Sequence, residues 1–290
     1  MDKDELIELA GNPNFISGIH NYCDRWCERC QFTSKCAVYA MEQADSDIDD
    51  SQARDITNEK FWRKMHERFQ LTAELISDWA AKNGVDLNSM DCEAAIAEHD
   101  REVEEAKQDE LTQTAHAYAD SVDDWFKHES ISESAIYDDT TGASESAPDD
   151  ITVTDAVDVI RWYQIFIAVK TFRAISGSSS FAGQEVEDEA LSFDCFSDEA
   201  EDDEDVDYDA VLMRSAKIDS HGSAKVALVA IARSTAAWRS LQISLPEKSD
   251  TIQPLLVSLD QLRRSLEARF PRAHEFIRPG FDEIITEFIS

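Results

Sequence analysis

The sequence has few basic residues, no long uncharged apolar run and no strand-like alternation, and each of these absences excludes a class of protein. Its 27 Lys and Arg are outnumbered by 61 Asp and Glu, so a broad nucleic-acid surface is disfavoured, because phosphate binding needs concentrated positive charge. No stretch reaches the roughly 18 uncharged apolar residues of a membrane span. The first residues, MDKDELIELAGNPNF, also lack the basic and then apolar pattern of a signal peptide. We therefore expect a cytoplasmic protein that does not associate with membranes.

The acidic charge is concentrated in three stretches. Residues 42–55, 133–150 and 185–209 together hold 26 acids and one base, which accounts for −25 of the formal net charge of −34. These stretches offer few apolar residues to offset the entropy of ordering, so we expect an acidic linker near residues 42–55 and disordered loops at 131–150 and 183–207. Three interpretations remain open: a solubilising role, a docking segment for a basic protein partner, and an adaptation to high salt.

Between the acidic stretches, apolar residues recur with the period of a helix. In TNEKFWRKMHERFQLTAELISDWAAKNG, one face collects several of them, and Asn83-Gly84 is a typical helix stop. That face consists of Phe61, Met65, Phe69, Thr72, Ile76 and Trp79. Similar patterns predict one long or two collinear helices over 91–129, and further helices over 151–177, 208–242 and 249–270. The helix over 208–242 is expected to be interrupted at His221-Gly222. The sequence therefore predicts an all-α fold, a helical bundle of about five main helices.

The predicted domain organisation has two parts. Residues 1–56 form a cysteine-rich metal-binding segment with an acidic linker, and residues 57–290 form the helical bundle with its long acidic loops. Within the bundle, the helix over 151–177 begins with Thr152 and Asp155 in capping-box spacing. It is apolar nearly all round, which places it at the centre.

Charged residues interrupt the apolar surface of that central helix. Asp158 and Arg161 lie on it, and Arg233 lies on the apolar side of its own helix. Buried charges are either paired or functional. Two interpretations therefore stay open: an Asp158–Arg161 ion pair with another acid for Arg233, or a buried polar pocket formed by these three residues. No catalytic triad or phosphate-binding loop stands out, so whether the chain is an enzyme is left open.

Four of the six cysteines lie in NYCDRWCERCQFTSKC, residues 21–36, with the spacing Cys23-x3-Cys27-x2-Cys30-x5-Cys36. A reducing compartment and a chain long enough to bury a core make a disulfide staple unnecessary. Structural zinc sites usually join two C-x2-C knuckles a dozen or more residues apart, and this segment lacks that gap. One short run can instead wrap an iron–sulfur cluster. We expect the four cysteines to hold a [4Fe-4S] cluster, with Zn²⁺ as the alternative.

Parts of this segment resemble stretches in known families. CERCQFTSKC resembles the C-x2-C-x5-C segment that helps hold a four-iron cluster in some RecB-like nucleases, with Cys27, Cys30 and Cys36 as the matching residues. The nuclease core is not matched, because Glu105-Ala-Lys107 falls inside a helical pattern, so the resemblance implies a cluster and no nuclease. Taken whole, YCDRWCERCQFTSKC is similar to a stretch of uncharacterised bacterial helical proteins, which implies no activity.

Two other metal chemistries fit the sequence less well. The spacing Cys23-x3-Cys27-x2-Cys30 is also that of radical S-adenosylmethionine enzymes, but the βα alternation of their barrel is absent. Di-iron helical bundles need Glu-x-x-His pairs, and none occurs. His116, Asp120, Asp124 and His128 repeat every four residues, yet they lie opposite the apolar face of their helix, which predicts a solvated surface.

Together these patterns predict an iron–sulfur protein that acts in electron transfer, redox sensing or a redox reaction, with a redox partner. The alternative is a zinc-stabilised helical scaffold or adaptor without catalysis, whose acidic loops meet a basic protein partner.

Overall fold

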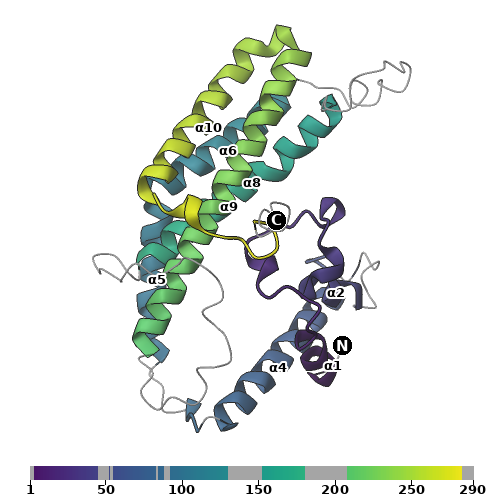
Figure 1. Cartoon of the computed structure of the whole chain (residues 1–290), viewed down its shortest axis with the longest axis vertical. Coiled ribbons are helices and arrows are strands. Elements are labelled where there is room, and N and C mark those ends of the chain that lie inside the picture. The colour runs from purple at the N-terminus through teal and green to yellow at the C-terminus, as the bar shows by residue number, and fades with distance from the viewer. Residues whose placement is uncertain are drawn as a thin grey trace, which may run out of the picture. The chain divides into compact units, whose positions relative to one another are not determined.

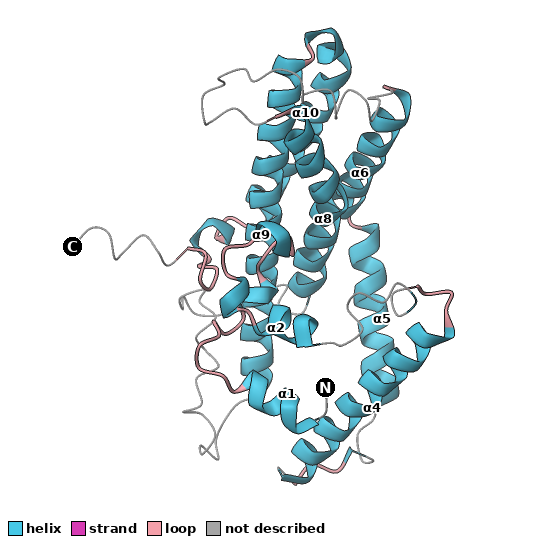
Figure 2. Cartoon of the chain, turned by 90° about the vertical axis from the view of Figure 1, so that its right-hand side faces the viewer, coloured by secondary structure: helices cyan, strands magenta, loops and turns pink. Residues whose placement is uncertain are grey.

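The computed structural model describes residues 3–44, 52, 55–82, 84–87, 92–129, 152–179 and 208–282. Within these ranges every regular element is a helix and none is a strand (Figure 2), which confirms the all-α class. Both predicted acidic loops, 131–150 and 183–207, lie outside the described residues. Among the helices that are described, none combines the length and the apolar character needed to cross a membrane.

The chain divides into two compact units, one of Met1–Glu98 with Pro279–Ser290 and one of His99–Arg278. The helices are labelled in Figure 1. The first unit contains α1 (Lys3–Ala10), α2 (Ala37–Ala44), α4 (Glu59–Lys82) and the cysteine segment between α1 and α2. The second contains α6 (Glu110–His128), α8 (Val153–Ser179), α9 (Tyr208–Ser244) and α10 (Ser249–Arg269), and α5 (Cys92–Gln108) spans the division. The division therefore falls within α5, whereas the sequence analysis placed it at residue 56.

Four helices of the second unit form a bundle around one core. α6 packs against α8 and α10, and α9 packs against the same two helices, so the contacts close a ring. Each helix supplies an apolar stripe with a period of three to four residues. On α6 this stripe is Leu111, Ala115, Tyr118, Val122 and Trp125, and on α10 it is Ile252, Leu255, Leu259, Leu262 and Leu266. The expected five-helix bundle is not confirmed, because α4 belongs to the first unit and buries a single residue, Ala80.

The helix with the most enclosed surface is α9, and the sequence-based placement of α8 at the centre is wrong. From Ile218 to Ile231 every residue of α9 is buried or half-buried. Many of these residues are small, which lets neighbouring backbones approach from several sides. The chain after α10 covers one of those sides, since Phe270 and Phe276 are buried and Lys225 Nζ donates to the carbonyl of His274 at 2.9 Å. α8, by contrast, leaves an apolar face exposed: Trp162, Ile165 and Val169.

The predicted interruption of α9 at His221-Gly222 is also wrong, because α9 runs unbroken from Tyr208 to Ser244. Asp219 and Ser220, the two residues just before that point, bind α8. Asp219 accepts two hydrogen bonds from Arg173 at 2.7 and 2.8 Å, and Ser220 Oγ donates to the carbonyl of Ala174 at 2.7 Å. On α8, Gly177 lies so close to Ser220 that a Cβ there would be 3.4 Å from the Ser220 Cβ. Gly177 is thus a packing residue inside α8 and not its end.

Several other predicted boundaries are confirmed. α4 ends at Lys82, and Gly84 has the left-handed φ of 68° that helix stops often need. The pattern over 91–129 consists of two helices, separated by Asp109, whose carboxylate accepts from the Leu111 N–H at 2.8 Å. α8 starts with the expected capping contacts, because Thr152 Oγ1 accepts from the Asp155 N–H at 3.1 Å and donates to the Asp155 carboxylate at 2.8 Å.

A few polar contacts fix the helices of the bundle to one another. In the core, Trp238 Nε1 donates to the Tyr118 hydroxyl at 3.0 Å, and Ser234 Oγ lies 3.3 Å from the same hydroxyl. At one end, Lys248 pairs with Glu129 at 2.7 Å, joining the end of α6 to the start of α10. The buried contacts of the Tyr118 hydroxyl specify register, because an unpaired polar group in the core costs more than an apolar one.

Candidate metal centre

Three short 3-10 turns and the start of α2 position the four cysteines in the first unit. The turns are η1 (Ile19–Asn21), η2 (Cys27–Arg29) and η3 (Thr33–Lys35). η2 begins with Cys27 and is followed by Cys30, whose N–H donates to the Cys27 carbonyl at 3.2 Å. η3 is followed by Cys36, whose N–H donates to the Thr33 carbonyl at 3.3 Å. The Cys-x2-Cys spacing therefore coincides with one tight turn, and the chain bends repeatedly between the first and the last cysteine.

The sharpest bend lies between Cys23 and Cys27. Among the described residues, Arg25 is the one non-glycine residue with positive φ, at 58°. A left-handed conformation costs an L-residue roughly 1–2 kcal/mol, so the surrounding contacts must hold it. One of them is an Asx turn in which the Asp24 carboxylate accepts from the Trp26 N–H at 3.2 Å. Strained residues of this kind gather at functional sites.

All four cysteines line one pocket, together with aromatic side chains. The aromatic lining consists of Trp26, Phe32, Tyr39 and Phe281. The four thiols are half-buried, and the cavity between the lining residues has a volume of about 20 Å³, room for about one water molecule. The cysteine spacing predicts that these four residues lie together, and all four line this pocket.

A segment from the far end of the chain completes the pocket wall. The rings of Phe32 and Phe281 meet edge to face, with centroids 5.0 Å apart. Gly280, the residue before Phe281, has a φ of 75°, and a Cβ on Gly280 would lie 2.9 Å from Ile16 Cδ1. Only glycine meets both conditions without strain. The role of Phe281 was missed in the sequence, because nothing local links it to a segment some 250 residues earlier in the chain.

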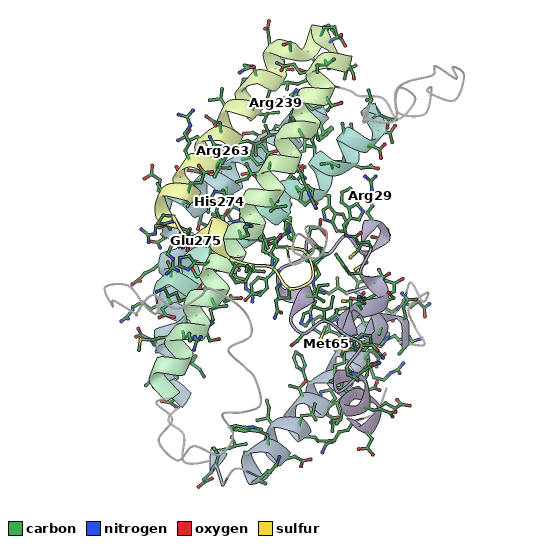
Figure 3. The ribbon with its side chains drawn as sticks, in the orientation of Figure 1. Arg29, Met65, Arg239, Arg263, His274 and Glu275 are labelled. Carbon is green, nitrogen blue, oxygen red and sulfur yellow. The ribbon has the colours of Figure 1, made fainter. Side chains whose placement is uncertain are left out.

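Backbone groups already contact two of the sulfurs. The Phe32 N–H donates to Cys30 Sγ at 3.4 Å, and Cys23 Sγ donates to the His20 carbonyl at 3.4 Å. N–H groups directed at a cysteine sulfur stabilise its thiolate and tune the potential of a cluster that it ligates. Arg29, labelled in Figure 3, lies over the Trp26 ring, with its Cζ 4.2 Å from the ring centroid.

Burial disfavours the thiolate form of two of the cysteines, Cys27 and Cys23. Burial raises the pKa of Cys27 to about 11, and the nearby Glu42 and the other three thiols add to the shift. Burial also raises the pKa of Cys23, although Arg25 opposes this through its backbone N–H and its charge. Because a metal binds the thiolate form, loading this site must release protons, and affinity must rise with pH.

The arrangement fits a thiolate-bound group only in part. The donor set is complete, since the Cys23, Cys27, Cys30 and Cys36 thiols face one cavity. Within the described residues, however, no three His, Cys, Asp or Glu side chains are grouped so that they could hold a metal ion. Four thiolates around one zinc, at a Zn–S distance of about 2.3 Å, would be only about 3.8 Å apart. The thiols must therefore move closer together to bind a single ion.

The other candidate residues lie exposed on the second unit. Asp158, Arg161 and Arg233, expected in or near a buried polar pocket, are all exposed. Arg161 stacks on Phe126, with its Cζ 4.6 Å from the ring centroid, and Arg233 donates to the Tyr163 hydroxyl. The ladder His116, Asp120, Asp124 and His128 is exposed along its whole length, as predicted for a solvated face.

Comparisons of the chain with protein-family models, with curated proteins and with solved structures find no match. Any functional conclusion therefore rests on the chemistry of the cysteine pocket and on the surfaces of the two units.

Proposed function

We propose that the protein binds a [4Fe-4S] cluster through Cys23, Cys27, Cys30 and Cys36 and acts in electron transfer or redox sensing. The observation that carries this proposal is the convergence of four thiols, separated by at most five residues from one to the next, on a single pocket. Thiolates are the ligands that iron–sulfur clusters use most, and a full set of four needs no further protein ligand.

Two features favour a cluster over a single zinc ion. The cysteines come from one continuous run, without the intervening loop or helix of paired zinc knuckles. The Phe32 N–H directed at Cys30 Sγ and the aromatic lining are the kind of surroundings that set a cluster's potential.

The charges near the pocket support the same proposal. A cluster held by four thiolates carries net negative charge, which the low-dielectric surroundings would otherwise disfavour. Arg25, Arg29 and Lys35 lie within the cysteine segment and are exposed. They would offset part of that charge while remaining hydrated. When bound, such a cluster supplies one-electron transfer, and the half-buried thiols would keep it within reach of a redox partner.

Substitution of one ligand tests the assignment. In anaerobically purified or reconstituted protein, Cys30→Ser should abolish the visible absorbance, because the cluster loses a ligand and a sulfur that accepts a backbone hydrogen bond. Cys92→Ser is the matched control, since Cys92 lies at the start of α5, outside the cysteine segment of residues 21–36. Equal colour in the two variants would show that the ligand set is wrong.

The second candidate function is a zinc-stabilised scaffold, favoured by the cavity volume of about 20 Å³, which is closer to the size of one ion than of a cluster. In that case the metal only fixes the fold of the first unit. Zinc-loaded protein would be colourless, and removing the metal with a chelator would unfold the cysteine segment and leave the bundle of the second unit intact.

A further inference from the structure

α4 carries a long apolar face that the first unit leaves exposed. Four of its large side chains are at least half exposed: Trp62 by 55%, Phe69 by 66%, Ile76 by 50% and Trp79 by 60%. Together with Met65 (Figure 3) and Thr72, these side chains recur at intervals that alternate between three and four residues. This is the a/d pattern of a coiled-coil seam, sustained over 18 residues. We call these six residues the α4 stripe.

The α4 stripe is self-complementary when two copies run in opposite directions. In an antiparallel pair each a residue packs at the level of a d residue of the other helix. A two-fold axis between Gln70 and Leu71 brings Trp62 level with Trp79 of the second helix, Met65 with Ile76, and Phe69 with Thr72. Large residues then meet at both ends, and the large Phe69 meets the small Thr72 near the middle. One register therefore matches all six positions.

The charges of α4 favour the same direction. Residues 60–68 carry four bases, Lys60, Arg63, Lys64 and Arg68, against one acid, Glu67. Residues 69–81 carry two acids and no base, although one of the acids, Asp78, also contacts Lys3 of α1. An antiparallel pair places the basic half of each helix beside the acidic half of the other. A parallel pair would place like charges together, which is destabilising.

We propose that the α4 stripe is an interface at which two copies of this chain associate through an antiparallel, two-fold symmetric pair of α4 helices. The interface is isologous, so one patch serves both copies. Aromatic side chains bury about 150–250 Å² each when covered, so the exposed parts of the stripe give roughly 800 Å² for both copies. That is below the about 1,200 Å² of standard stable interfaces, so we expect a weak, reversible dimer.

Sedimentation velocity of the full chain over a concentration series tests this proposal. At an ionic strength of about 0.15 M the Debye length is about 8 Å, which screens most of the net negative charge. We expect a monomer–dimer equilibrium, weakened at least ten-fold by Met65→Glu or by Ile76→Lys. Gln70→Glu and Gln70→Lys are the matched controls, because Gln70 is exposed on α4 outside the stripe, and each should leave the equilibrium unchanged.

The double variant Met65→Glu with Ile76→Lys tests the direction of the helices. In the antiparallel register each new acid faces the new base of the other copy, so association should recover relative to either single variant. A double variant that associates no better than the singles overturns the antiparallel register. A wild-type chain that stays monomeric at all concentrations overturns the interface itself and indicates that another part of the same chain, or a different protein, covers the stripe. Far-UV circular dichroism checks that each variant keeps its helix content.

Discussion

Tyr118→Phe should destabilise the four-helix bundle far more than Tyr163→Phe, although both changes remove one hydroxyl from a buried tyrosine. The Tyr118 hydroxyl accepts from Trp238 Nε1 at 3.0 Å and lies 3.3 Å from Ser234 Oγ, and all three residues are almost fully buried. Burial raises the pKa of Tyr118 to about 12, so the hydroxyl stays neutral. The Tyr163 hydroxyl instead bonds to Arg233, which is exposed.

The magnitudes follow from what each change leaves behind. Without the Tyr118 hydroxyl, the Trp238 N–H loses its partner in a dry core, which costs about 1–3 kcal/mol, and Ser234 loses a weaker contact. We expect a total of about 2–3 kcal/mol, equivalent to about 4–12 °C in Tm for a unit of this size. Without the Tyr163 hydroxyl, Arg233 turns to water, and the loss should stay below about 1 kcal/mol.

Urea unfolding followed by circular dichroism measures both variants against the wild type, with an unchanged m value as the check that the unfolded states are comparable. If Tyr118→Phe costs no more than Tyr163→Phe, the hydroxyl network does not hold α6 and α9 together in the way the distances indicate.

Two further predictions concern pH and backbone conformation. His221 is buried against Phe270 and bonds through Nδ1 to the Lys217 carbonyl at 2.9 Å, and burial lowers its pKa from the ordinary 6.5. The unfolded chain therefore binds more protons below about pH 6.5, and stability falls as the pH drops through that value. His221→Gln should flatten this part of the stability profile, and an unchanged slope in urea unfolding at several pH values would contradict it. Gly280→Ala should destabilise the first unit more than Gly84→Ala, because both have a φ near 70° but only the first Cβ meets Ile16, at 2.9 Å. Limited proteolysis of the first unit reads this out, and equal sensitivity of the two variants would argue against the contact.

The helices could be predicted because their signals are local. α6 and α10 bury the residues that their three-to-four-residue period selects, and Asp109, Thr152 and Gly84 mark helix ends by well-understood capping and conformational preferences. The four cysteines stand out as a candidate site for a similar reason, because they lie within one short run of the sequence. That they hold a metal or a cluster stays a prediction.

The tertiary environment of the helices could not be predicted in the same way. Gly222 is a helix breaker by propensity, yet close packing around α9 holds it in the middle of a helix. α8 looked central because it is apolar nearly all round, but Trp162, Ile165 and Val169 face outward. The same holds for α4, whose apolar face predicts a helix correctly without revealing what covers that face. Periodicity shows which residues share one face of a helix. Whether that face is buried depends on partners that lie elsewhere in the sequence.

The cysteine site shows the same limit. Spacing brought the thiols together, but the pocket also depends on Phe281 and Gly280 near the other end of the chain. The polar pocket was one of two interpretations of Asp158, Arg161 and Arg233, and all three residues are exposed. The two arginines can place their charged ends in water while their stems pack on the helix.

Metal and sulfide analysis of the anaerobically purified protein, together with its absorption spectrum, tests the central claim most directly. We expect a brown protein with broad absorbance at about 400 nm that contains iron and acid-labile sulfide in equal amounts. This is the result for a [4Fe-4S] cluster on Cys23, Cys27, Cys30 and Cys36. A colourless protein that contains one zinc per chain and no sulfide would contradict it.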